Sequence, residues 1–128
     1  MKKLYTFLVC AILVTTYSVL QSRGAVRGSR IIHFVALKYK SSTSDAEKIA
    51  LRSNFRALKK KIPGIISIES GENNSVEKRN KDFTDAFVIK FKNEKDRDFY
   101  LTHPEHVAFK NKNLPLIDDV FVMDFWSK

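Results

Sequence analysis

Residues 31–39 (IIHFVALKY) are almost continuously apolar and rich in aromatic and β-branched side chains. Such side chains favour β-strands, and here apolar residues fall on both alternating faces of the segment. His33 interrupts the apolar run. The pattern predicts a strand that is covered on both sides.

The next segment carries one apolar stripe with the period of an amphipathic helix. Its apolar positions are Leu51, Phe55, Leu58 and Ile62. Ser44 and Glu47 have the spacing of a capping box, which marks the start of a helix. Pro63 and Gly64 follow the stripe, and this pair ends helices. A helix is therefore predicted between the capping box and Pro63.

Two further strands are predicted around a polar loop. Residues 65–70 (IISIES) form a short second strand, and residues 83–91 (FTDAFVIKF) form a third with alternating apolar positions. The residues between them, 71–82 (GENNSVEKRNKD), are polar and contain Gly and Asn. They predict an exposed loop.

The C-terminal part of the chain predicts two helical pieces and a last strand. Asn93 can cap a short helix that runs to about Leu101. His103-Pro104 breaks this helix, and Pro104 suits the first position of a new helical turn. Residues 105–118 have an irregular helical pattern, and residues 120–125 (VFVMDF) form the closing strand.

The predicted order is β-α-β-β-α-β, which indicates an α+β, ferredoxin-like domain with its helices on one face of an antiparallel sheet. Such a sheet leaves its other face in water, yet these strands are apolar on both faces. A second copy of the same sheet is the simplest cover for that face. We therefore expect a homodimer.

The N-terminus predicts export. Lys2 and Lys3 precede an uncharged apolar run over residues 4–20, which is typical of a signal peptide or an N-terminal anchor. We assign residues 1–25 to this leader, residues 26–30 to a linker and residues 31–126 to the folded domain. Cys10, in the leader, is the only cysteine of the chain. The domain itself therefore has no disulfide, thiol nucleophile or cysteine metal site.

The charge of the chain does not predict binding to nucleic acid. The formal net charge is +9, but Lys and Arg are scattered along the sequence. The tightest basic run, Lys59-Lys60-Lys61, falls at a helix end, where it complements the helix dipole. The RNA recognition motif shares the predicted element order, but residues 83–91 lack its glycines.

Four side chains are candidates for chemistry: His33, Tyr100, His103 and His106. Neutral imidazole is a common general base, and a phenol donates a hydrogen bond to a carbonyl. Structural roles are the alternative: His103 before Pro104 can cap a helix, and Tyr100 can be a core residue. The His-x-x-His spacing does not match a helical metal-ligand pair, so no metal site is predicted.

Several segments together resemble the stress-responsive A/B barrel (Dabb) family, which includes plant olivetolic acid cyclase. The resemblance runs from about residue 31 to 125 and rests most on YLTHPEHV, which begins at Tyr100. The supporting segments are residues 32–39, residues 62–64 and the closing residues 122–125. It implies a ferredoxin-like domain that forms a dimeric α/β barrel, and this would cover the second sheet face.

The resemblance also implies roles for three residues. The cyclase closes a linear polyketide without a cofactor, and its pattern is matched here by His33, Tyr100 and His106. His106 would be the base, Tyr100 would hold a substrate carbonyl or carboxyl, and His33 would help to orient the chain. His103 would be structural. The implied function is a barrel that binds or converts a small apolar or aromatic ligand, without cofactor or metal.

A second hypothesis stays open beside this one. The barrel can be a stress-protection or interaction scaffold in which the histidines are structural. Enzymatic activity is therefore undecided from the sequence. If there is a reaction, it is of the cyclase or lyase type.

Overall fold

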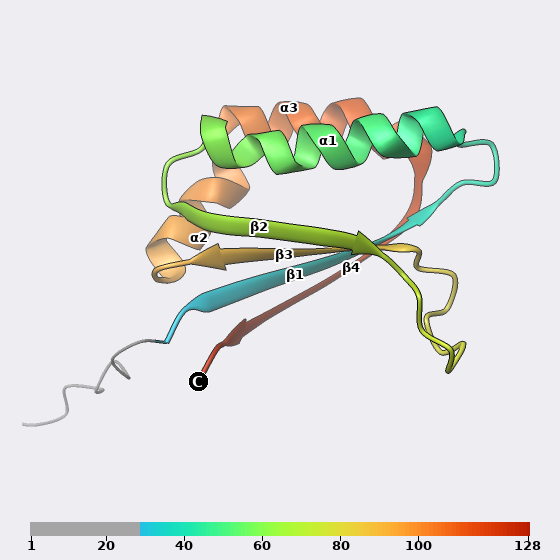
Figure 1. The fold of residues 1–128 in the computed structure, drawn as a ribbon. Helices are drawn as coiled ribbons and strands as arrows, with labels where there is room; N and C mark the ends of the chain where they lie inside the picture. The colour runs from blue at the N-terminus through green and yellow to red at the C-terminus, as the bar shows by residue number, and fades with distance from the viewer. Residues whose placement is uncertain (1–28) are drawn as a thin grey trace, which may run out of the picture.

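Four β-strands form one antiparallel sheet, and the helices of residues 29–128 all pack on one of its faces (Figure 1). This computed structural model describes residues 29–128. The predicted leader over residues 1–25 and most of the predicted linker over 26–30 lie outside the described residues. Among the described residues, no helix combines the length and apolar character needed to cross a membrane.

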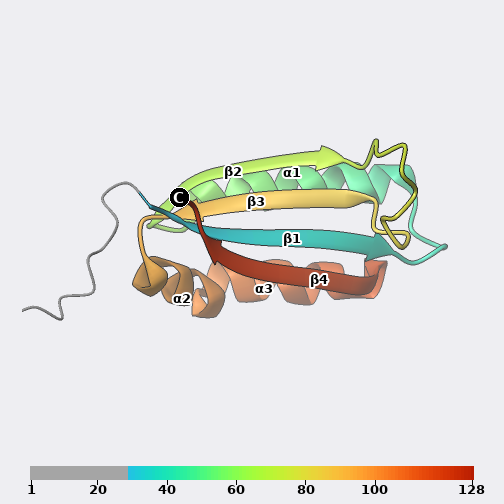
Figure 2. The same ribbon diagram turned by 90° about the horizontal axis from the view of Figure 1, so that it is seen from below.

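The element order is the predicted one, and the second helical region is divided at His103-Pro104 as predicted. The elements in chain order are β1 (Ile31–Tyr39), α1 (Asp45–Lys61), β2 (Ile65–Glu72), β3 (Asp85–Phe91), α2 (Glu94–Thr102), α3 (Pro104–Asn113), a 3₁₀ turn (Leu114–Leu116) and β4 (Ile117–Trp126). The strand order across the sheet is β2-β3-β1-β4 (Figure 2). This is the ferredoxin-like arrangement that the sequence predicts.

Strand β1 lies inside the sheet and pairs antiparallel with β3 on one side and β4 on the other. His33 stands opposite Ile89 of β3 and Asp124 of β4. Because directly opposite residues point to the same face, the β4 register brings Asp124 beside His33. The register therefore places a carboxylate next to the His33 ring.

Helix α1 forms as the sequence predicts. Ser44 accepts a hydrogen bond from the Glu47 amide and the Glu47 carboxylate accepts one from the Ser44 amide, so the capping box is complete. The four predicted apolar positions are all buried. Phe55 stacks on Phe87 of β3 with ring centroids 4.0 Å apart, which ties the helix to the sheet.

Several predicted boundaries were wrong. Strand β3 begins at Asp85 rather than residue 83, because Lys81 and Asp82 take positive φ angles and turn the chain just before it. Strand β2 continues to Glu72 rather than residue 70. The helix predicted over 105–118 ends at Asn113, a 3₁₀ turn containing Pro115 follows, and β4 then begins at Ile117 rather than residue 120.

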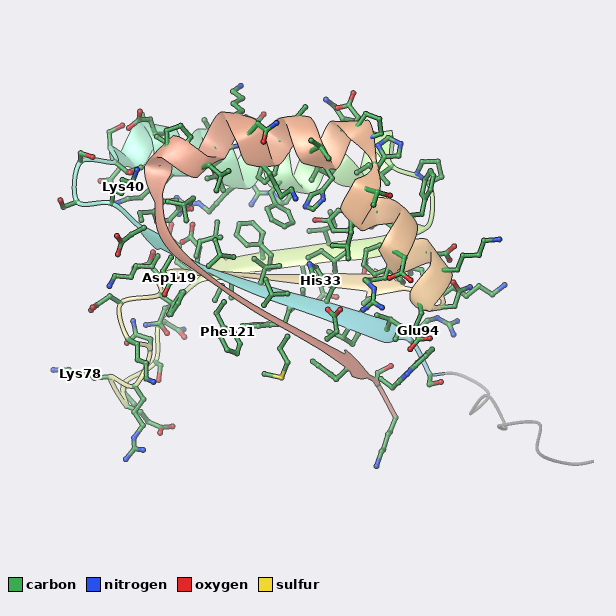
Figure 3. All side chains as sticks on the ribbon, turned by 180° about the vertical axis from the view of Figure 1, so that it is seen from behind. His33, Lys40, Lys78, Glu94, Asp119 and Phe121 are labelled. Carbon is green, nitrogen blue, oxygen red and sulfur yellow. The ribbon has the colours of Figure 1, made fainter. Side chains whose placement is uncertain are left out.

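The sheet face away from the helices is apolar, as predicted, and nothing within residues 29–128 covers it fully. Phe121, Met123 and Phe125 of β4 point to this face and are 44%, 48% and 47% exposed. Figure 3 shows Phe121 on this side of the sheet. Phe34 of β1 contacts Phe121 edge-on. We call the apolar surface around Phe34, Phe121, Met123 and Phe125 the far face.

A buried ion pair joins α1 to the sheet at the start of β3. Asp85 of β3 is 3% exposed and accepts hydrogen bonds from Arg52 of α1 at 3.1 and 3.2 Å. The Tyr39 hydroxyl donates to the same carboxylate at 2.5 Å. Burial, together with this bond to Asp85, raises the pKa of Tyr39. Asp85 is thus fully paired, as a buried charge must be.

Replacing Asp85 with Ala is expected to destabilise the domain by about 3–5 kcal/mol, because Arg52 and Tyr39 would lose their buried partner. The free energy of unfolding in urea measures this. The matched control is Asp118→Ala, which removes an exposed carboxylate paired with Lys38 and costs at most about 1 kcal/mol. Equal losses in the two variants would contradict a structural role for the buried pair.

Candidate functional site

The junction between α2 and α3 is built on His103 and Pro104. His103 is at once the C-cap of α2 and the N-cap of α3, and its Nδ1 accepts a hydrogen bond from the Glu105 amide at 3.2 Å. Pro104 is the first residue of α3, where its missing N–H costs nothing. The capping role predicted for His103 is therefore confirmed.

A cavity of about 330 Å³ lies between the sheet and helices α1 and α3. Its walls are mostly apolar, and its lining includes all three residues that the resemblance singled out: His33, Tyr100 and His106. The apolar lining residues are Val35, Leu37, Leu51, Phe55, Leu101, Phe109, Leu114, Ile117, Val120 and Val122. An apolar cavity with a few convergent polar groups is the usual form of a small-molecule site.

Tyr100 is the centre of this group. Its side chain is fully buried, stacks on His106 with ring centroids 4.1 Å apart, and meets His33 edge-on at 5.7 Å. Its hydroxyl has no hydrogen-bond partner among residues 29–128. Burial raises the pKa of Tyr100, so the phenol is protonated at neutral pH. It is a donor whose partner the described part of the chain does not supply.

The tautomer of His106 follows from one contact. Its Nδ1 lies 3.2 Å from the backbone carbonyl oxygen of Leu101, and a carbonyl only accepts hydrogen bonds. Nδ1 therefore carries the proton, and Nε2 of the neutral ring has a free lone pair. Burial lowers the pKa of His106, although the Leu101 bond opposes the shift; the charges of Lys110 and His33 lower it further. His106 is thus neutral at neutral pH.

His33 is linked through Asp124 to Arg97 of α2. Its Nδ1 lies 2.6 Å from Asp124 Oδ1, and Asp124 Oδ2 accepts a hydrogen bond from Arg97 of α2. Figure 3 shows His33 on the strand beneath the helices. A carboxylate bound to Nδ1 fixes both the ring orientation and the tautomer of a histidine. Asp124 can therefore orient His33 toward the cavity.

Sequence reasoning missed Asp124, Arg97 and Lys110. Asp124 is the one polar residue in the segment predicted as the closing strand (120–125), and an antiparallel pairing of the first and last strands places it opposite His33. Arg97 gave no such signal, because its position depends on how α2 packs. Lys110 lies four residues after His106 in the predicted helical segment, and this spacing could have placed it on the same helix face. Within residues 29–128, no group of three or more His, Cys, Asp or Glu residues is placed to hold a metal ion.

Comparisons with known proteins place this chain in a family. Residues 31–127 match the family model described as the stress responsive A/B barrel domain. A search of curated proteins found no match.

The solved structures agree with the observed fold. A protein from Arabidopsis thaliana is 23% identical with a TM-score of 0.74, over 77% of this chain and 95% of that one. A hydroxynitrile lyase from Passiflora edulis is 21% identical with a TM-score of 0.73, over 77% of this chain and 94% of that one. A dimeric protein of unknown function from Bacteroides fragilis, described as having a ferredoxin-like fold, is 29% identical with a TM-score of 0.60, over 75% and 94%.

These likenesses and the match to the family model lead to one conclusion. The family match spans nearly all of the described residues, and the sheet order and helix placement are those of ferredoxin-like structures. The chain belongs to the stress responsive A/B barrel domain family.

Proposed function

We propose that this chain forms a homodimeric barrel whose domains each bind, and convert, a small apolar or aromatic ligand. His106 acts as the base and Tyr100 as the hydrogen-bond donor. The observation that carries the proposal is the convergence of His33, Tyr100 and His106 on one apolar cavity. We also propose that the protein is exported; the support for this is the apolar segment near its N-terminus.

The homodimer is supported by the far face. Large apolar side chains lie half exposed there, and a contiguous apolar surface of this kind marks an interaction site. The two sheets would pack with their far faces together and their helices outside, so that both faces of each sheet are covered. The Bacteroides fragilis relative is described as dimeric, which favours a second copy of this chain over a different partner.

The chemistry supported by the cavity is the removal of a proton from a carbon next to a carbonyl. The proton moves to Nε2 of His106, and the electron pair of the C–H bond passes to the carbonyl oxygen. Tyr100 then donates its hydrogen bond to that oxygen, where negative charge develops. The protonated His106 later returns the proton to the product.

The reaction class is supported by one relative. The Passiflora edulis protein is named a hydroxynitrile lyase, so a protein of this fold carries out a lyase reaction. In a cyclase reaction of this chain, His106 would take the proton from carbon, and in a lyase reaction the same base would take the proton of a hydroxyl group. The residues available for it are those of the cavity, with His33 oriented by Asp124.

A non-catalytic stress-protection scaffold is the alternative, and one contact favours it. The bond from His106 to the Leu101 carbonyl links α3 to the end of α2, which is a structural role. In a scaffold, loss of His106 would reduce stability and change nothing else. Measuring activity and stability in the same variants separates the enzyme hypothesis from the scaffold hypothesis.

Phe121→Glu is expected to give a monomer, because a charge on the far face cannot be buried against a second apolar sheet. Sedimentation velocity measures the mass. The matched control is Ile49→Glu, which places the same charge at an exposed apolar position on α1, on the other side of the sheet. A Phe121→Glu protein that stays dimeric, or an unchanged protein that is monomeric, would rule out the proposed dimer.

His106→Ala is expected to slow proton exchange in a bound ketone by about 10²–10⁴-fold, because the base is removed. The probe is phenylacetone in D₂O, with deuterium incorporation next to its carbonyl followed by NMR. Tyr100→Phe should slow exchange by about 10²-fold, because it removes the hydrogen bond to the developing oxyanion.

The control for these two variants is Lys112→Met, on α3 but outside the cavity lining. It should exchange phenylacetone at the rate of the unchanged protein. Thermal melting of each variant shows whether the domain still folds. Exchange that is unaffected by His106→Ala, together with a lower melting temperature, would favour the scaffold.

The pH dependence of this exchange follows from the lowered pKa of His106. The base is active when neutral, so the rate should fall as the pH is lowered and reach half of its plateau value below pH 6.5, the ordinary pKa of histidine. The groups around His106 are Lys110 on α3, His33 on β1 and Tyr100 on α2, and Tyr100 stays neutral throughout this range. A rate that already falls well above pH 6.5 would show that the base titrates at a higher pH than proposed.

A further inference from the structure

Lys110 is a cation on the wall of the same cavity. It follows His106 by four residues on α3, so both side chains lie on one face of the helix. Both line the cavity, although the Lys110 side chain is exposed toward solvent and His106 is buried. The charge of Lys110 lowers the pKa of His106, which agrees with their closeness.

The charge on the cavity wall is not balanced. Asp124 is the one carboxylate among the residues that line the cavity, and it is held by His33 and Arg97. Lys110 takes part in none of the ion pairs or side-chain hydrogen bonds found within residues 29–128. Lys61 of α1 is paired with Glu105 at 2.8 Å. Lys60, Lys95 and Lys112 also have no such partner among the described residues, but they do not line this cavity, whereas Lys110 does. Lys110 therefore leaves one positive charge at the edge of an apolar cavity without a counter-ion from the described residues.

We infer that the ligand of this cavity carries a carboxylate, which Lys110 binds while the apolar part of the ligand fills the space beneath Tyr100 and His106. This inference rests on the proposed function and names its ligand class. The lining consists otherwise of aliphatic and aromatic side chains together with Asn113. The Asn113 amide donates one N–H to the Phe109 carbonyl at 2.7 Å and carries no charge, so Lys110 is the one Lys or Arg side chain among the residues that line this cavity.

The size of the cavity limits the apolar part. A cavity of about 150 Å³ holds one benzene molecule, and this one measures about 330 Å³. One aromatic ring with a short chain therefore fits. An ion pair at the partly exposed edge contributes modestly, because water screens it.

The test compares two probes of nearly the same shape, phenylbutanoate and phenylbutanol, whose dissociation constants are measured by NMR titration near neutral pH. The unchanged protein should bind the carboxylate about threefold to fivefold more tightly than the alcohol. Lys110→Met should abolish this preference, and Lys110→Arg should keep it. High salt should reduce the preference, because it screens the exposed pair.

Lys112→Met is the matched control. Both lysines lie in the last turn of α3, where either can stabilise the helix dipole. If that were the whole role of Lys110, both variants would lower the melting temperature and neither would change the ratio of the two dissociation constants. Val120→Trp, at an exposed position that lines the cavity, should weaken the binding of both probes.

Each outcome decides between the proposals. If the alcohol binds, and Val120→Trp weakens it, but the carboxylate has no advantage, the carboxylate inference is wrong and the ligand-binding proposal stands. A preference that survives Lys110→Met also overturns the inference. If neither probe binds, or if Val120→Trp affects neither, both the inference and the proposed ligand site are contradicted.

Discussion

The break between α2 and α3 at His103 and Pro104 determines the geometry on which the site depends. Pro104 has no N–H to donate, so α2 ends before it. His103 has an extended backbone (φ −63°, ψ 135°), which turns the chain, and it caps both α2 and α3. Tyr100 in the last turn of α2 then stacks on His106 in the first turns of α3. A continuous helix would separate these two rings around its axis. The His103 cap therefore brings together Tyr100 and His106, to which we assign the donor and base roles.

Two features of the cavity depend on this arrangement and on the sheet beneath it. The Leu101 carbonyl, at the end of α2, fixes the proton of His106 on Nδ1 and leaves Nε2 free. The Tyr100 hydroxyl is buried without a partner from residues 29–128, and an unsatisfied buried hydroxyl costs roughly 1–3 kcal/mol. A ligand oxygen would remove that cost. The domain thus gives up some stability at the place where we propose that a ligand binds, which is common at functional sites.

Much of the fold could be predicted from the sequence, because strand and helix periodicity, the Ser44 capping box and the Pro63-Gly64 stop are local signals. The segment boundaries at residues 83 and 118 could not, because they depend on backbone turns that the apolar pattern does not show. For the site, the resemblance selected His33, Tyr100 and His106, and the structure brings these three to one cavity. Their roles in a reaction stay predictions. Asp124 was missed because the strand register places it beside His33. Arg97 was missed because its contact with Asp124 depends on how α2 packs.

The central claim is that His106 is a neutral base with a free Nε2 facing the cavity. Nitrogen-15 NMR of the imidazole ring across a pH titration measures both the tautomer and the pKa of His106 directly. We expect a proton on Nδ1 and a pKa below the ordinary value of 6.5. A proton on Nε2, or a pKa above that value, would contradict it.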